Sequence, residues 1–236
     1  MSRKRLLLSS AALLICTFAT VWIGCFSADR QERQNRALIS AIKRNDTGRV
    51  LALLRNGAEP NARDDTVSTT VWALLWARLS GKPVRFASGP SALDVLFESA
   101  IVLEHPDQPW RIQRFTIRKE PVAIVRALVA KGANVRGNIA DMRGWPLVLI
   151  PAQYGWADSV QIMLDKGADI NARGVNGVTV LSFAVTSRNA ELVKLLISCG
   201  VNVNARDAQG KSVLTEAYMI STPEIVEMLK RAGATR

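Results

Sequence analysis

A short glycine-centred motif recurs along the chain at a nearly constant interval, and this repetition limits the possible folds more than any other feature. Gly167, Gly200 and Gly233 are equally spaced, and Gly132 precedes Gly167 by almost the same interval. Similar residues surround each glycine, in the segments 55–63, 130–135, 165–173, 198–206 and 231–234. A fixed period of this length, about 33 residues, indicates a solenoid in which each unit buries its apolar face against its neighbours. We therefore expect the units to lie side by side in sequence order.

Each unit is predicted to contain two helices. Apolar residues at helical spacing precede the repeated glycines at 50–54, 124–128, 160–164, 192–196 and 225–229. These segments predict the second helix of each unit, which the glycine ends in a left-handed turn. First helices are clearest at 179–185, 212–218 and 91–96, where Thr179, Ser212 and Ser91 can cap the helix. The small Ala184 and Ala217 would let neighbouring helices approach closely.

These segments resemble the ankyrin repeat family. The family pattern Leu-Leu-x-x-Gly-Ala-Asp-x-Asn-Ala is well kept, above all at Leu164 to Ala172, whereas no unit keeps both Pro and His of the Thr-Pro-Leu-His-x-Ala block. The resemblance covers roughly residues 35–65 and 90–236. It implies an all-α fold, an ankyrin repeat solenoid of stacked helix-turn-helix units with inter-repeat turns. It also implies binding of other proteins as the shared activity.

The expected organisation is an N-terminal membrane anchor or signal segment at 1–28 and an ankyrin repeat domain at 29–236. We place the repeats at about 35–65, 90–138, 144–177, 178–210 and 211–236. The interval from Gly57 to Gly132 is more than twice the usual period, so we expect insertions at 65–88 and 105–119, flanking a first helix near 91–104. A second registration makes Thr69 to Ala77 the first helix of an extra unit, and periodicity does not choose between the two.

The N-terminal end of the chain has the pattern of a membrane segment. Residues 6–26 form an unbroken run without a charge, after Arg3, Lys4 and Arg5. About 20 apolar residues at about 1.5 Å rise span a hydrocarbon core of about 30 Å. The length favours an uncleaved transmembrane helix, since the apolar region of a signal peptide usually has about 7–15 residues. A cleaved signal ending near Cys25–Ala28 and a lipoprotein lipidated at Cys25 remain alternatives; Ile23-Gly24-Cys25 fits a bacterial lipobox, but Trp22 stands where that pattern usually has Leu.

The basic N-terminus also predicts an orientation. Positive flanks stay on the cytoplasmic side, so the C-terminal domain is expected to face outward. In a Gram-negative bacterium this means a single-pass inner-membrane protein with a periplasmic domain. The alternative is a lipoprotein, or a protein secreted after cleavage.

Charge and cysteine content exclude some classes of protein. The net charge of +11 favours acidic proteins, nucleic acid or anionic lipid as partners. Nucleic acid is disfavoured because no helix-turn-helix, zinc-finger or aromatic RNA-binding signature accompanies the charge. Of Cys16, Cys25 and Cys199, the last alone lies in the repeats, so an internal disulfide and a zinc site with several thiolates are excluded there.

Two sets of residues are candidates for partner binding. Arg63, Arg173 and Arg206 share one repeat position, which we expect near the tip of the inter-repeat turn. Their forked donors could bind an acidic partner, or they could simply be solvated turn residues. The second set comprises aromatic residues of the insertions, which serve as interface anchors or cover adjacent helices. This set is Trp72, Trp76, Phe86, Trp110 and Phe115.

No enzyme motif accompanies the repeats. The sequence has no Gly-x-Ser-x-Gly, no phosphate-binding glycine loop and no His-Glu-x-x-His. The single histidine, His105, lies in a loop-like part of the second insertion, and a serine nucleophile needs a base. We therefore expect no catalytic activity, no metal and no cofactor.

The leading functional hypothesis is a protein-interaction scaffold held at the membrane through residues 6–26, which binds or regulates an envelope partner protein. The alternative is a basic structural protein that associates with anionic lipid or cell-wall polymer. Binding of the second kind should weaken steeply with salt.

Overall fold

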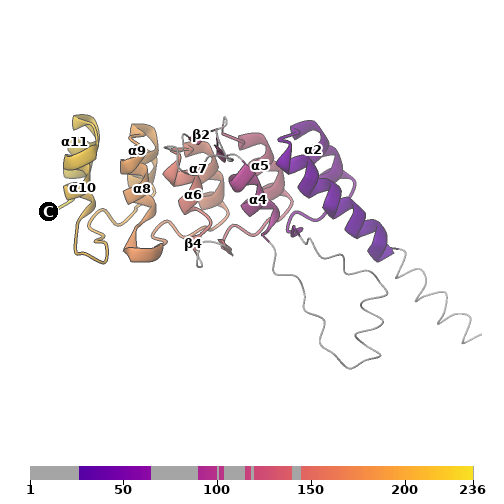
Figure 1. Cartoon of the computed structure of the whole chain (residues 1–236). Coiled ribbons are helices and arrows are strands. Elements are labelled where there is room, and N and C mark those ends of the chain that lie inside the picture. Colours follow the sequence, from indigo (N-terminus) through magenta and orange to yellow (C-terminus); the bar gives the residue numbers. More distant parts are fainter. Residues whose placement is uncertain are drawn as a thin grey trace, which may run out of the picture.

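The structure is a computed structural model, and it describes residues 27–64, 90–99, 101–103, 115–117, 120–139 and 145–235. Pairs of antiparallel helices stack side by side in sequence order, from the N-terminal end to the C-terminal end of an elongated solenoid (Figure 1). The expectation that the segments ending at Gly132, Gly167 and Gly200 lie beside one another in order is confirmed, since α5 (Val122–Ala130) packs on α7 (Ala157–Asp165) and α7 packs on α9 (Ala190–Ser198).

The second helices form where the apolar spacing predicts them, and each has nine residues. They are α2 (Thr47–Arg55), α5 (Val122–Ala130), α7 (Ala157–Asp165), α9 (Ala190–Ser198) and α11 (Pro223–Arg231). In α9, for example, Leu192, Val193 and Leu196 are buried on one face. The glycine that follows each second helix has a positive φ, between 78° and 93°. The predicted left-handed helix ends are therefore confirmed.

The first helices form a second layer. They are a helix that covers residues 27–43, α4 (Ala92–Ser99), α6 (Leu149–Gln153), α8 (Val180–Thr186) and α10 (Val213–Ile220). The side chain of Thr179 accepts a hydrogen bond from the Ser182 backbone, and Ser212 caps α10 in the same way. Ser91 and Asp94 cap α4 reciprocally, so all three predicted caps are confirmed.

The core lies between the two helix layers. α6 packs on α8 and α8 on α10 in one layer, while α2, α5, α7, α9 and α11 pack in succession in the other. Ala184 and Ala217 are fully buried, as expected for small residues between close helices. No helix pair buries its apolar face alone, so each repeat depends on its neighbours for stability.

Two short antiparallel hairpins depart from the expected all-α structure. Strand β1 (Ile101–Leu103) pairs with β2 (Phe115–Ile117), and β3 (Asn138–Ile139) pairs with β4 (Trp145–Pro146). The first helix expected near 91–104 is thus wrong at its C-terminal end, because α4 ends at Ser99 and a strand follows. The β-branched Ile101 and Val102 favour a strand once a partner strand is available.

Among the described residues, the long interval between Gly57 and Gly132 contains one helix pair, α4 and α5, with a long connection before α4 and another after it. Arg63 pairs with Ser91 just as Arg173 pairs with Thr179 and Arg206 with Ser212, but the chain between the first pair is several times longer. The β1–β2 hairpin then enlarges the connection from α4 to α5. Within the described residues, α2 packs directly on α5. The registration with Thr69 to Ala77 as an extra first helix concerns residues outside the described ones and stays a prediction. The division of the whole chain at residue 28 stays a prediction.

Within the part of the chain that the structure describes, no helix combines the length and the apolar character needed to cross a membrane. The apolar run at 6–26 and Cys25 lie outside the described residues. The transmembrane, signal and lipidation hypotheses therefore stay predictions.

Candidate functional site

The three arginines of the repeat position lie at the base of the inter-repeat hairpins. Arg173 pairs with Thr179 and Arg206 with Ser212, and these partners are the residues that cap α8 and α10. In the hairpin between Arg173 and Thr179, the tip is instead the 3-10 turn Val175–Gly177. The expected position near the tip is therefore wrong, because the chain closes an antiparallel bridge before it enters the next helix.

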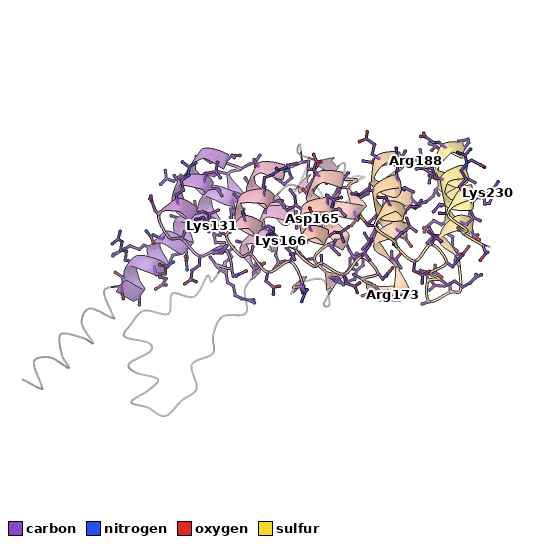
Figure 2. All side chains as sticks on the ribbon, turned by 180° about the vertical axis from the view of Figure 1, so that it is seen from behind. Lys131, Asp165, Lys166, Arg173, Arg188 and Lys230 are labelled. Carbon is purple, nitrogen blue, oxygen red and sulfur yellow. The ribbon has the colours of Figure 1, made fainter. Side chains whose placement is uncertain are left out.

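The side chains of two of these arginines bind neighbouring backbone. Arg173 Nη1 donates to the carbonyl of Arg206 at 2.9 Å, and Arg206 Nη1 donates to the carbonyl of Gly210 at 2.8 Å. Both side chains remain exposed along one edge of the solenoid, where Figure 2 labels Arg173. A guanidinium has five N–H donors, so these bonds use part of its capacity. Arg173 and Arg206 thus join adjacent hairpins, and their contact with a partner stays a prediction.

A ladder of asparagine side chains, which the sequence reasoning did not single out, connects successive repeats. Asn61 Nδ2 donates to the carbonyl of Gly132 at 3.0 Å, and its Oδ1 accepts from the backbone N–H of Asn134. Asn204 makes the same two contacts with Gly233 and Thr235. The signal was present in the sequence as the Asn of the repeated Asn-Ala pair. These bonds satisfy backbone groups just after α5 and α11, which otherwise lack intrahelical partners.

A partly exposed aromatic pair crosses two adjacent repeats. Trp145 comes from β4 and Phe183 from α8, and their ring centroids are 5.5 Å apart at an interplanar angle of 43°. Both side chains pack against the core while keeping part of their surface in solvent. A Cβ on Gly174 would lie 3.4 Å from the Trp145 ring and 3.0 Å from Leu149, so glycine leaves the room that the indole needs. We call Trp145 and Phe183 the aromatic pair.

A charged pair follows on the next repeat. Lys211 Nζ lies 3.8 Å from Glu216 Oε1, and Glu216 occupies on α10 the repeat position that Phe183 occupies on α8, one unit earlier. Partial burial raises the pKa of the Glu216 carboxyl, Lys211 opposes this shift and Asp207 adds to it. On the side of the solenoid formed by the first helices, the aromatic pair is therefore followed one repeat later by the partly buried Lys211–Glu216 ion pair.

Two further ring–ring contacts among the described residues lie in the core. Trp156 is 5 % exposed and lies between Phe97 and Tyr154, with ring centroids 6.2 Å and 5.4 Å away. Burial raises the pKa of the Tyr154 hydroxyl. Tyr154 and Trp156 lie in the connection from α6 to α7, and Phe97 of α4 packs against Trp156.

Several of the residues that the sequence suggested for partner binding, catalysis or lipidation are outside the structural description. Trp72, Trp76, Phe86, Trp110, His105 and Cys25 lie outside the described residues, and Phe115 belongs to strand β2. Among the described residues, no three His, Cys, Asp or Glu side chains gather in a way that would hold a metal ion. Cys199 is an exposed free thiol.

The repeats that carry the aromatic pair are close to electrically neutral. Residues 151–235 contain eight Lys or Arg and eight Asp or Glu, so the net charge of +11 comes from the rest of the chain. Long-range attraction of an acidic partner to these repeats is consequently weak, and recognition there depends on contact surface.

Comparison with protein families identifies these repeats. The family model described as ankyrin repeats (3 copies) matches residues 151–235, which contain α7 to α11 and most of α6. The helix pairs before residue 151 stack in the same manner. Ankyrin repeats are typically non-catalytic modules that bind other proteins. Residues 151–235 are therefore ankyrin repeats, a kind of module that typically binds other proteins.

Proposed function

We propose that the chain is a membrane-held scaffold that binds one envelope partner protein through the aromatic pair and the adjoining first helices. The observation that carries this proposal is the aromatic pair itself, since two rings from different repeats keep exposed surface beside a packed core. Aromatic side chains are favoured anchors at protein interfaces because they bury large area with little loss of conformational freedom.

The surface around the aromatic pair suits a partner with apolar anchors and few charges. Residues 151–235 carry no net charge, and the nearby Lys211–Glu216 pair can align one polar contact. Thr186 lies one turn after Phe183 on α8 and is exposed. Since residues three apart share a face of a helix, Thr186 should lie at the margin of the bound partner.

Membrane attachment is the second half of the proposal. The apolar run at 6–26 is long enough to span a bilayer, and the basic residues before it favour an outward or periplasmic position of the repeats. Attachment would raise the local concentration of the scaffold near an envelope partner.

Photo-crosslinking in the native host tests the partner surface. A photoreactive amino acid placed at Thr186 on α8 should give one discrete protein adduct. The same amino acid at Lys194, exposed on α9 in the other helix layer, serves as the matched control and should not give that adduct.

A second variant connects the adduct to the aromatic pair. Phe183→Leu keeps an apolar side chain at a partly exposed site, so the fold should persist while the ring contact is lost. We expect the Thr186 adduct to weaken several-fold in this background. Equal adducts from Thr186 and Lys194, or an adduct insensitive to Phe183→Leu, would contradict the proposed surface.

The alternative function is association with anionic lipid or cell-wall polymer. The position of the excess positive charge in the chain supports it. The whole excess of +11 falls outside residues 151–235. If this function is the main one, binding of the full chain to anionic polymer should fall steeply between low and physiological salt, because exposed charges are screened beyond about 8 Å. Binding through the aromatic pair should change little over the same range.

A further inference from the structure

The first helix of the solenoid is longer than the other first helices. It is helical from residue 27 to residue 43, whereas α8 and α10 have seven and eight residues. Arg36 stands at the same distance before Gly57 as Thr179 does before Gly200, so Arg36 is the point where the equivalent helices begin. Residues 27–35 therefore extend the helix into the place that an inter-repeat hairpin occupies in later units. We call residues 27–35 the stalk.

Side chains of the stalk reproduce the asparagine ladder. Asn35 Oδ1 accepts from the backbone N–H of Glu59 at 3.0 Å, and Gln31 Nε2 donates to the carbonyl of Gly57 at 2.9 Å. The equivalent backbone groups of the next unit, Asn134 N–H and the Gly132 carbonyl, are bound by Asn61. The stalk thus supplies the contacts that a preceding repeat would otherwise make.

Further bonds hold the stalk helical and attached. Gln34 Nε2 donates to the carbonyl of Asn56 at 3.2 Å. Asp29 pairs with Arg33 at 2.9 Å, and Glu32 pairs with Arg36. An acidic residue four positions before a basic one is the more favourable order on a helix. The hydrogen bonds from the stalk to residues 56–59 therefore fix the direction of the stalk helix relative to the first repeat.

The stalk points toward one defined edge of the solenoid. Its N-terminal end lies on the edge that carries β4 and the inter-repeat hairpins, while β2 and the turns within helix pairs lie on the opposite edge (Figure 1). Figure 2 shows the same division, with Arg173 on the hairpin edge and Arg188 on the turn edge. At about 1.5 Å per residue, the nine residues of the stalk measure about 13 Å.

We propose that the stalk orients the solenoid so that the hairpin edge faces an anionic lipid surface and the turn edge faces away. This inference rests on the proposed membrane attachment through residues 6–26, which end immediately before the stalk. Arg173 and Arg206 are exposed on the hairpin edge and would lie near the lipid headgroups. The aromatic pair remains accessible beside the membrane, so a partner would be held close to the lipid.

Energy transfer from labelled repeats to a lipid acceptor tests this orientation. The full chain, with Cys16, Cys25 and Cys199 replaced by alanine, is reconstituted in phosphatidylcholine vesicles that contain phosphatidylglycerol and an acceptor-labelled lipid. A donor is attached at Gln209→Cys on the hairpin edge or at Glu224→Cys on the turn edge. Both positions are exposed. Gln209 lies in the hairpin that leads into α10 and Glu224 lies at the start of α11, so they are at a similar distance along the solenoid from the stalk.

We expect higher transfer from position 209 than from position 224. A Gly-Gly-Ser-Gly-Gly insertion between Phe26 and Ser27 leaves Gln31, Asn35 and their contacts intact but separates the stalk from residues 6–26. In this variant the difference between the two positions should disappear. Circular dichroism of the variant should match that of the parent.

The outcomes separate this inference from the membrane proposal. Vesicle flotation first reports whether the chain is attached; a chain that stays unbound would overturn both attachment and orientation. An attached chain with equal transfer from both positions, or higher transfer from position 224, would overturn the orientation alone. A difference that persists in the insertion variant would show that the stalk does not impose it.

Discussion

At the scale of single residues, the repeat depends on backbone conformations that few side chains tolerate. Gly200 has a φ of +78° at the end of α9, and no heavy atom lies within 4 Å of the position that a Cβ would occupy. A side chain added there meets no steric obstacle, so any cost comes from the backbone alone. Gly200 is therefore a suitable position for measuring the free-energy cost of the left-handed backbone conformation.

We predict that Gly200→Ala lowers the free energy of unfolding by about 1–2 kcal/mol, the usual cost of the left-handed conformation for a residue with a Cβ. Gly200→Asn should cost less, because asparagine adopts this conformation more readily. Urea denaturation followed by circular dichroism measures both values. Equal losses for the two variants would refute the backbone explanation.

At the scale of helices, α7 is capped from another repeat. Trp156 stands at its N-cap and supplies no side-chain hydrogen bond, unlike Asn189 at the N-cap of α9. The carboxylate of Glu120, which precedes α5, instead accepts a hydrogen bond from the backbone N–H of Ser159 at 2.7 Å. The indole of Trp156 fills the core, and the capping role moves to a residue that is distant in sequence.

We predict that Glu120→Ala lowers the free energy of unfolding by about 1 kcal/mol, the typical value for loss of a helix cap. Glu120→Gln should retain most of the stability, since its amide oxygen can still accept the bond. Glu224→Ala removes an exposed carboxylate from the first turn of α11 and is the matched control. A loss at position 120 no larger than at position 224 would indicate a charge effect without a specific cap.

At the scale of the whole molecule, the solenoid continues through a unit whose connections are much enlarged. The N–H of Asp64 donates to the carbonyl of Pro90 at 2.9 Å, as Gly174 does to Val178 at 2.8 Å. Asp64 and Pro90, which flank residues 65–89, therefore meet in the geometry of an ordinary inter-repeat hairpin. α2 packs on α5 while this hairpin geometry is kept.

We predict that replacing residues 65–89 by Val-Asn-Gly, the sequence of 175–177, preserves a cooperative fold. A shorter loop loses less entropy on closure, by about 0.6 kcal/mol for each halving of length, so the free energy of unfolding should not fall. Urea denaturation and circular dichroism test this. A transition that splits in two would show that the first repeat had separated from the others.

The sequence by itself determined the repeat period, the second helices, the glycine turns and the hydroxyl caps. These features depend on interactions between residues a few positions apart, such as Thr179 with Ser182, and local chemistry is sufficient to define them. The ankyrin resemblance followed from the same local pattern.

Only the tertiary structure decided which side chains form the candidate surface. Trp145 reaches Phe183 across two repeats, Arg173 binds the backbone of Arg206, and Gln31 and Asn35 take the place of a preceding repeat. Each contact joins residues that are far apart in sequence, and its existence depends on how the helix pairs and hairpins stack. Periodicity specifies which residues are equivalent but not which side chains meet. For this reason the arginines were expected near the tip of the inter-repeat turn, and the aromatic pair was missed.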